Sequence, residues 1–410
     1  MKRRQAIKFI TVSISSSLIE TKYYSGDKYM LGSTVKNHYD WILLYWMPYD
    51  NNLSRFGQPI IQMLSKGVKN DNVLVVVQSD FSGAAQVSRS IISQGKVDTQ
   101  YLETADSSSP EVLSEYLSWA KSHFQAKRWA IVFLGHSGTL MEISPDEHPT
   151  SPLISEIRWM NLQKINQVIL NFHQSVNGNL ELLFFQNCNK GNIEVHHTFQ
   201  NTGKYTLSSQ LELGAPNYYY EQSLSYLSDY PDIDGSQLAK KIMDYEQRDM
   251  YHSLTLTNNH YFRYFAEKVN VVIDSILQAD IAPVKVFISS ILEPEVNFSN
   301  NTTVVVYRSF GETFVDFANF LQKLTQLSGA SPSACNDLLF FLNNSLIQRV
   351  QQNGELLDSI IRPKYKNLSG LGLFLPRNRQ ELEKYLYLSV YSELKLVELF
   401  EAVVFETKKN

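Results

Sequence analysis

One cysteine of this sequence is placed to act as a nucleophile. Cys188 follows the apolar run 180–185, from which Gln186 and Asn187 separate it, and it precedes the polar segment 189–191, where a helix can begin. A helix N-terminus favours a thiolate, and a position beyond a strand end leaves the sulfur accessible. The commoner role of a lone cysteine is that of a small buried hydrophobic side chain. The polar neighbours of Cys188 argue against that role, whereas Cys335, at the start of an amphipathic helix, fits it.

The candidate base is His136, which follows the apolar run 129–134. Gly135 and Gly138 on either side of it let the backbone turn tightly and approach a ligand. A neutral imidazole near a thiol can remove the thiol proton and later return it to the leaving group. A structural loop histidine is the alternative. Because His136 and Cys188 follow two strands expected at one sheet edge, we favour a catalytic Cys–His dyad, without an acidic third member.

A second nucleophile competes for the same loop. Gly135-His-Ser-Gly138 after a buried strand is similar to the G-x-S-x-G nucleophile elbow, in which Ser137 would attack the substrate. Thr139 stands where the elbow has its last glycine, and a loop-like sequence follows where the elbow requires a helix. An α/β-hydrolase that uses Ser137 therefore stays open as the less favoured alternative.

The elements that must position these residues alternate along the chain. Continuous apolar runs of strand length occupy 41–47, 72–78, 129–134 and 180–185. Segments of helix length occupy 53–66, 109–126 and 160–174. Runs that are apolar on both faces are typical of strands buried in a parallel sheet, and their alternation with helices predicts a doubly wound α/β fold. The loops that leave the carboxyl ends of these strands, where such sheets bind ligands, are 48–52, 135–138 and 186–191.

The downstream part of the chain is less regular. Strands are predicted at 204–209, 302–308 and 370–376. Helices are predicted at 235–250, 259–278, 314–327 and 333–352, with two more after residue 376. The polar, proline-containing stretch 139–157 predicts an exposed loop. The predicted organisation is an N-terminal tail over 1–40, a catalytic domain over 41–250 and a C-terminal subdomain over 251–410.

Composition narrows the class of protein. The chain has 410 residues, 43% of them hydrophobic and 19% charged, which is a globular balance. Two cysteines exclude a disulfide framework and a metal site built on several thiolates. A net charge of −4 and the lack of a long basic run give no argument for a nucleic-acid partner. No apolar stretch reaches the roughly 18 residues that would indicate a membrane span.

The first residues allow two interpretations. Arg3 and Arg4 precede a mildly apolar stretch, 9–19, which is similar to a twin-arginine export signal. Lys8 interrupts the approach, serines dilute the apolar part, and no small-x-small cleavage site follows. A charged tail, and with it a cytoplasmic protein, is slightly favoured, while export stays open.

With His136 and Cys188 in place, the chain resembles the clostripain family of cysteine peptidases, relatives of caspases and gingipains. The resemblance covers about residues 41 to 405. It rests on the order and spacing of five segments: Tyr45–Leu53, Gly135–Gly138, Cys188–Glu194, Leu207–Gln210 (with Pro216 and Tyr220) and Gly370–Pro376. It implies a caspase-like, mostly parallel central sheet flanked by helices, with a C-terminal α/β extension. It also implies hydrolysis of protein or peptide substrates through an acyl-enzyme on Cys188.

The resemblance further implies residue roles. The expected lining of the first specificity pocket is Gln186, Ser209, Gln210 and Glu212. The expected oxyanion donors are the backbone amides of Ser137, Gly138 and Cys188. The family usually carries Asp where this chain has Gln186, and Gly where it has Ser137. A preference for Arg or Lys is therefore expected to depend on Glu212, and a catalytically impaired caspase-like binding or regulatory module stays open.

Two further expectations concern cofactors and processing. The chemistry requires no cofactor, and a dependence on calcium is implied by the resemblance alone, because no loop has carboxylates clustered at ligand spacing. The segment 139–160 follows the histidine where the family is often cut, so we predict a processing or access segment. Arg158 is its only basic residue, and Lys164 lies just beyond it. The oligomeric state is not predicted.

Overall fold

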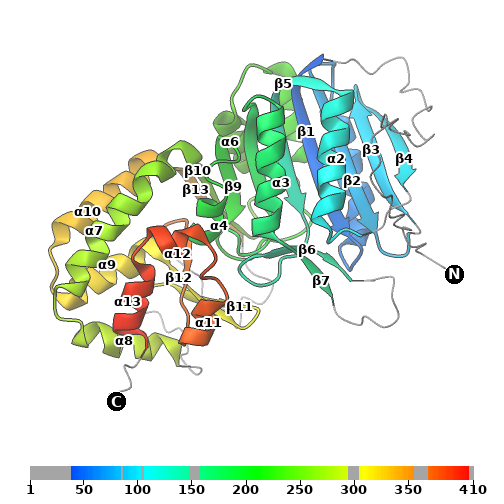
Figure 1. The fold of residues 1–410 in the computed structure, drawn as a ribbon. Helices are drawn as coiled ribbons and strands as arrows, with labels where there is room; N and C mark the ends of the chain where they lie inside the picture. Colours follow the sequence, from blue (N-terminus) through cyan, green and yellow to red (C-terminus); the bar gives the residue numbers. More distant parts are fainter. Residues whose placement is uncertain are drawn as a thin grey trace, which may run out of the picture.

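The computed structural model describes residues 38–84, 86–102, 106–147, 157–293, 304–354 and 368–405. Its main feature is a nine-stranded sheet with the strand order β13-β10-β9-β8-β5-β1-β2-β3-β4 (Figure 1). The middle strands, from β9 to β2, pair in parallel, and the strands outside them pair antiparallel. This confirms the mostly parallel central sheet flanked by helices. The predicted export signal lies outside the described residues.

The four apolar runs form the middle of the sheet. The parallel strands are β1 (His38–Tyr49), β2 (Val73–Phe81), β5 (Gln125–Leu134), β8 (Leu180–Gln186) and β9 (Tyr205–Ser209). Alternate residues of one strand enter different cores: Leu43 and Tyr45 of β1 pack on one face of the sheet, and Leu44 and Trp46 pack on the other. Because both faces are covered, these strands carry apolar residues without alternation.

Helices cover both faces of this sheet. The helices that contribute to one core are α1 (Ser54–Gly67), α5 (Tyr220–Asp229) and α6 (Gly235–Tyr245). The helices that contribute to the other core are α2 (Pro110–His123), α3 (Leu162–Ser175) and α4 (Ile193–Thr198). Helix α2 starts where the sequence predicts, because the Ser109 side chain accepts a hydrogen bond from the Val112 amide and Pro110 occupies the first turn.

The C-terminal extension has a smaller sheet with its own helices. Its strands, in the order β11-β12-β14, are β11 (Val306–Ser309), β12 (Glu312–Asp316) and β14 (Gly372–Phe374). Its helices include η1 (Asn259–Tyr264), α7 (Phe265–Leu277), α8 (Ala282–Leu292), α9 (Phe317–Ser328), α10 (Pro332–Phe341), α11 (Arg379–Glu383), α12 (Ser389–Glu393) and α13 (Leu396–Val403). The predicted C-terminal α/β extension is therefore present.

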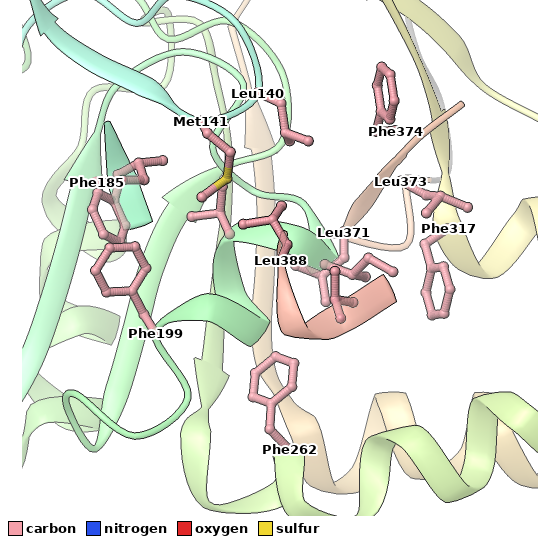
Figure 2. Close-up of a cluster of buried hydrophobic side chains, with 14 of the residues drawn as sticks. Leu140, Met141, Phe185, Phe199, Phe262, Phe317, Leu371, Leu373, Phe374 and Leu388 are labelled. Atoms are coloured by element: carbon pink, nitrogen blue, oxygen red, sulfur yellow. The ribbon is translucent and has the colours of Figure 1, made fainter. Parts of the chain in front are cut away.

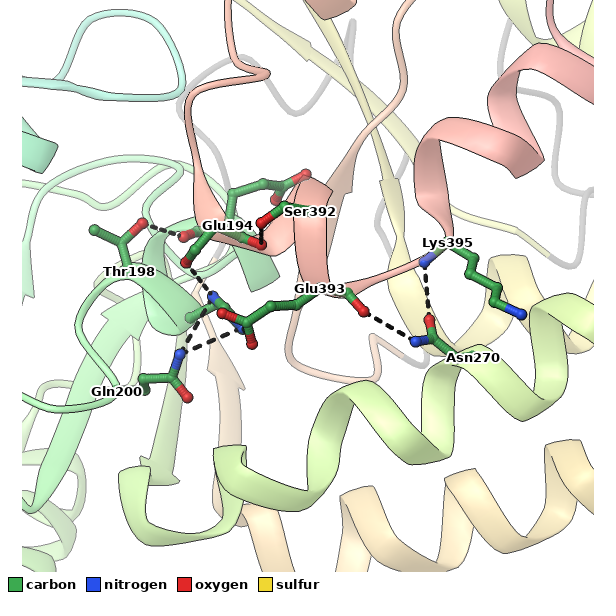
Figure 3. Close-up of polar contacts among 9 residues, drawn as sticks. Glu194, Thr198, Gln200, Asn270, Ser392, Glu393 and Lys395 are labelled. Carbon is green, nitrogen blue, oxygen red and sulfur yellow. Dashed lines mark hydrogen bonds and ion pairs between the residues drawn. The ribbon is translucent and has the colours of Figure 1, made fainter.

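The extension shares a core with the central sheet. One hydrophobic cluster includes Phe185 at the end of β8, Phe199 after α4, and Phe374 of β14 (Figure 2). A polar contact adds to this junction: Oε2 of Glu393 in α12 lies 3.1 Å from Nε2 of His197 in α4. Within the extension, Asn270 of α7 donates to the Glu393 carbonyl at 2.9 Å and accepts from the Lys395 amide at 2.8 Å (Figure 3). The edge of the sheet that carries the candidate site is thus packed against the extension.

Three local predictions need correction. The predicted helix 333–352 ends at Phe341; a π-helical turn, Leu342–Leu346, and strand β13 (Ile347–Asn353) follow. Strand β13 lies at the sheet edge and is mostly polar, so it has no apolar run to mark it. The predicted loop 139–157 contains β6 (Glu142–Asp146), which pairs with β7 (Arg158–Asn161); residues 148–156 lie outside the described ones.

The antiparallel strands β3 (Val87–Ser93), β4 (Lys96–Leu102) and β10 (His252–Asn258) were not predicted.

Residues beyond position 250 also enter the central sheet. Strand β10 pairs with β9, and β13 pairs with β10, both antiparallel. The predicted division at residue 250 thus falls within a sequence whose later strands complete the first sheet. Within the described parts of the chain, no helix combines the length and apolar character needed to cross a membrane.

Candidate active site

The two candidate catalytic residues leave neighbouring strands at the same sheet edge. Strands β5 and β8 are parallel, with Leu134 opposite Gln186. His136 and Cys188 each lie two residues beyond that pair. The Asn187 side chain donates a hydrogen bond to the Gly135 carbonyl at 2.7 Å, which joins the two loops directly. The geometry therefore brings a thiol and an imidazole to one edge of the sheet.

Cys188 is half-buried and its sulfur contacts the backbone of one residue. The thiol donates to the Leu213 carbonyl at 3.8 Å, and the Leu213 amide donates to the sulfur at 3.4 Å. Burial raises the pKa of Cys188, and the charge of Glu212 raises it further, against the hydrogen bond from Leu213 and the charge of Lys190. Helix α4 begins only at Ile193. The prediction that a helix N-terminus directly after Cys188 stabilises its thiolate is therefore wrong. Burial and the charge of Glu212 thus favour the neutral thiol over the thiolate.

His136 is half-buried and oriented by a residue after β1. Its Nε2 lies 2.7 Å from Oδ1 of Asn52, which is exposed. Because a carbonyl oxygen accepts, Nε2 carries the proton and Nδ1 is free to act as the base. Burial lowers the pKa of His136, which keeps the imidazole neutral. Sequence analysis placed the loop 48–52 at this edge but did not single out Asn52.

Ser137 does not have the geometry of a nucleophile elbow. Its side chain is buried, with 3% of its surface exposed, and its hydroxyl has no hydrogen-bond partner among the described residues. A turn and strand β6 follow it, whereas the elbow requires a helix. The structure therefore contradicts the Ser137 alternative.

One predicted oxyanion donor is already paired. The Gly138 amide donates to the Glu142 carbonyl at 3.0 Å, in the turn that leads into β6. A Cβ atom at Gly138 would lie 2.6 Å from Glu142 Oε2 and 3.1 Å from Trp159 Cδ2, so any larger residue would have to move the Glu142 carboxylate and press on the Trp159 ring. The predicted role of the Gly138 amide as a free donor is thus wrong in this geometry. The amides of Ser137 and Cys188 keep that assignment as a prediction.

Gln186 lies at the centre of a buried hydrogen-bond network. Its Nε2 donates to Asn217 Oδ1 at 2.5 Å and to the Tyr220 hydroxyl at 2.7 Å. The Tyr219 hydroxyl donates to its Oε1 at 2.5 Å. Both ends of the amide are therefore occupied. An Arg or Lys side chain would find one lone pair of Oε1 in use by Tyr219, and displacing that partner would cost a buried hydrogen bond.

Two carboxylates lie near this network. Glu212 is half-buried, and its charge raises the pKa of Cys188, so it lies within electrostatic reach of the sulfur. Glu246 was not predicted; it is buried and accepts a hydrogen bond from the Tyr218 amide at 3.1 Å. Burial raises the pKa of Glu246, against hydrogen bonds that include one from Asn217. Of the two, only Glu212 acts on the candidate nucleophile.

The other two predicted pocket residues have structural partners. The Ser209 hydroxyl shares a hydrogen bond with the Ser253 hydroxyl of β10 at 3.2 Å. The Gln210 side chain donates from Nε2 to Oδ2 of Asp316, at the end of β12, at 3.0 Å. Both side chains are fully buried. Their contacts join β9 to β10 and to the extension, and their predicted role in substrate binding stays a prediction.

Lys190 is a fully buried lysine beneath the two loops. Its ammonium donates to the carbonyls of Thr139 at 2.6 Å and Leu140 at 3.1 Å. Glu312 of the extension accepts from the Leu140 amide at 2.7 Å and from the Tyr385 hydroxyl. Burial lowers the pKa of Lys190 to about 7, against the charges of Glu312 and Glu142. Lys190 thus ties the nucleophile loop to the turn after His136, a role that its place in a polar loop did not reveal.

The family assignment follows from a comparison of the whole sequence. The sequence model of the clostripain family matches residues 45–402, from β1 to α13. The chain belongs to the clostripain family. It is therefore a cysteine peptidase, which agrees with a thiol and an imidazole at one sheet edge. No curated protein matches the sequence.

Two solved structures of clostripain-type proteases share the fold. One is an inactive zymogen C11 protease from Parabacteroides distasonis, with 15% identity, a TM-score of 0.60, and coverage of 90% of this chain and 99% of that chain. The other is a secreted C11 cysteine protease from Bacteroides thetaiotaomicron, in complex with an irreversible peptide inhibitor, with 16% identity, a TM-score of 0.62, and coverage of 88% and 100%. At such identities the likeness establishes the caspase-like fold.

The segment expected to be processed in this clostripain-family chain is flanked by paired residues. Arg158 of β7 forms ion pairs with Asp106 at 3.2 Å and with the buried Asp146 of β6 at 3.3 Å. The one basic residue of the segment 139–160 is thus held by two carboxylates. Processing of this segment stays a prediction.

The described residues offer no ready metal site. Within the ranges that the structure covers, no group of three or more His, Cys, Asp or Glu side chains is arranged to hold a metal ion. A dependence on calcium therefore stays an expectation of the family resemblance, and no step of the chemistry below is assigned to a metal.

Proposed function

We propose that this clostripain-family chain hydrolyses peptide bonds with Cys188 as the nucleophile and His136 as the general base and acid. The observation that carries the proposal is the hydrogen bond from Asn187 to the Gly135 carbonyl, because it fixes the nucleophile loop against the histidine loop. The neutral state of His136 supports it, since only an unprotonated imidazole can accept the thiol proton.

The proposed reaction proceeds in two halves. Nδ1 of His136 takes the proton of Cys188 as the sulfur attacks the substrate carbonyl, and backbone amides of Ser137 and Cys188 donate to the oxyanion, worth about 3 kcal/mol each. The C–N bond then breaks, the imidazolium protonates the leaving amine, and a thioester remains on Cys188. Water, deprotonated by His136, attacks the thioester and releases the acid and the thiol. In this scheme the substrate displaces the contacts of Leu213 with the sulfur.

Protein or peptide substrates are the proposed substrate class. The family membership supports this, as does the peptide inhibitor bound by the Bacteroides thetaiotaomicron protease of the same fold. For the first specificity pocket we propose a preference for Arg or Lys that depends on Glu212, because the amide of Gln186 is neutral and occupied. A library of peptides varied at this position tests it. Glu212→Gln should reduce a basic preference about tenfold, or about 1.4 kcal/mol; an unchanged basic preference contradicts the role of Glu212.

The dyad is tested by two substitutions and a matched control. Cys188→Ala and His136→Ala should each abolish peptide hydrolysis while the thermal midpoint of unfolding stays close to that of the wild type. Cys335→Ala removes the other thiol, which is buried in α10, and should keep the activity. Activity that survives Cys188→Ala would contradict the proposed mechanism.

A further inference from the structure

A hairpin of the C-terminal extension reaches the nucleophile loop. Strands β11 and β12 are joined by a two-residue turn, Phe310–Gly311, with Ser309 paired opposite Glu312. Asn189, the residue after Cys188, donates from its side chain to the Ser309 hydroxyl at 3.0 Å. The tip of this hairpin is therefore anchored one residue away from the proposed nucleophile.

The same hairpin tip also meets the histidine loop through an aromatic pair. Trp159 of β7 lies against the backbone of Gly138, two residues after His136, since a Cβ atom there would be 3.1 Å from its ring. The rings of Trp159 and Phe310 meet edge to face, with centroids 6.0 Å apart and an interplanar angle of 75°. One aromatic pair thus adjoins both loops that carry the dyad.

Phe310 has an unfavourable backbone conformation for its side chain. Its φ is 49° and that of Gly311 is 78°, as in the type I′ turns that prefer Asn-Gly. A bulky residue in the left-handed region costs roughly 1–2 kcal/mol. Burial does not offset this cost, because 59% of Phe310 is exposed. Arg377 donates to the Gly311 carbonyl at 3.1 Å, and this hydrogen bond holds the turn that carries the exposed Phe310 ring.

We propose that Phe310, with Trp159, forms an apolar subsite that binds an aromatic or aliphatic side chain of the peptide substrate close to the scissile bond. The exposed ring offers apolar surface whose burial by such a side chain stabilises the complex. This inference rests on the proposed role of Cys188, because it places the scissile bond at that sulfur. In this proposal the C-terminal extension, through Phe310, takes part in substrate selection.

Phe310→Asn tests the subsite without endangering the fold. Asn is a preferred residue at this turn position, so the thermal midpoint should stay equal or rise. The substrates are hexapeptides with one cleavage site, in which Phe replaces Gly at each other position in turn. At one position Phe should raise kcat/KM of the wild type about tenfold, mainly through KM, and Phe310→Asn should remove that gain. Phe340→Ala changes another exposed ring, on α10, with 70% of its surface exposed, and should leave the gain intact.

A binding measurement separates this inference from the proposed mechanism. Fluorescein-labelled versions of the same hexapeptides are titrated against Cys188→Ala protein and against the double variant with Phe310→Asn. The favoured Phe peptide should bind about tenfold more weakly to the double variant, while the Gly peptide binds both equally. Equal binding of the Phe peptide to both proteins overturns the subsite. Hydrolysis by Cys188→Ala protein overturns the mechanism instead, and leaves the comparison of affinities valid.

Discussion

Glu194 should make the stability of this protein fall as the pH rises. The residue is fully buried in α4, beneath the junction with the extension (Figure 3). Its Oε1 accepts from the Phe374 amide at 2.9 Å and from the Tyr391 hydroxyl at 3.1 Å, while its Oε2 has no partner among the described residues. Burial raises the pKa of Glu194 from 4.5 to about 7, and the charge of Glu312 adds to the effect.

The sign and size of the effect follow from proton binding. Because the folded-state pKa lies above the unfolded value, the folded protein binds more protons than the unfolded chain between these pH values. The stability that Glu194 contributes is therefore fully present below pH 4.5 and is lost as the pH rises through about 7. At about 1.36 kcal/mol per pH unit, the whole range amounts to about 3.4 kcal/mol. Between pH 5.5 and 8 the expected loss is about 2 kcal/mol.

Glu194→Gln isolates this contribution. Its side-chain oxygen can still accept from Phe374 and Tyr391, and any cost of the buried amide group is independent of pH. The free energy of unfolding, measured by urea denaturation with tryptophan fluorescence, should gain about 2 kcal/mol relative to the wild type from pH 5.5 to pH 8. Glu398→Gln changes an exposed carboxylate on α13 and should leave the pH dependence unaltered. Parallel curves for wild type and Glu194→Gln would refute the reasoning.

Four further predictions concern the loops of the site. Because burial lowers the pKa of His136, the acid limb of the pH profile of kcat/KM should lie below pH 6.5. Asn52→Ala removes the hydrogen bond to His136 and should lower kcat about tenfold with little change in KM. An unchanged kcat would exclude an orienting role for Asn52. Ser137→Ala removes a buried hydroxyl without a partner among the described residues, so the free energy of unfolding in urea should be equal or higher by up to about 1 kcal/mol. The activity should stay within twofold of that of the wild type, and loss of activity would restore a role for the hydroxyl. If the segment 139–160 is cut by the protein itself, intact-mass spectrometry should find two chains in the active wild type and one in Cys188→Ala, and a single chain in both would exclude obligatory self-cleavage.

The sequence by itself determined the middle of the sheet and the edge that carries the site. Strands β1, β2, β5 and β8 are apolar on both faces. This pattern is local, so it is visible in the sequence without knowledge of tertiary contacts. Once these strands are parallel neighbours, the residues after β5 and β8 must meet, so His136 and Cys188 could be singled out without coordinates. The family resemblance added the caspase-like connection of these strands and the extension.

Only the tertiary structure decided what surrounds those two residues. Asn52 and Leu213 reach His136 and Cys188 from loops after other strands, and Lys190 is buried only because the turn after His136 and the extension close over it. Phe310 meets the site from a hairpin about 120 residues away along the chain. Such contacts depend on how distant segments pair and pack, and neither hydrophobic periodicity nor residue spacing records that information.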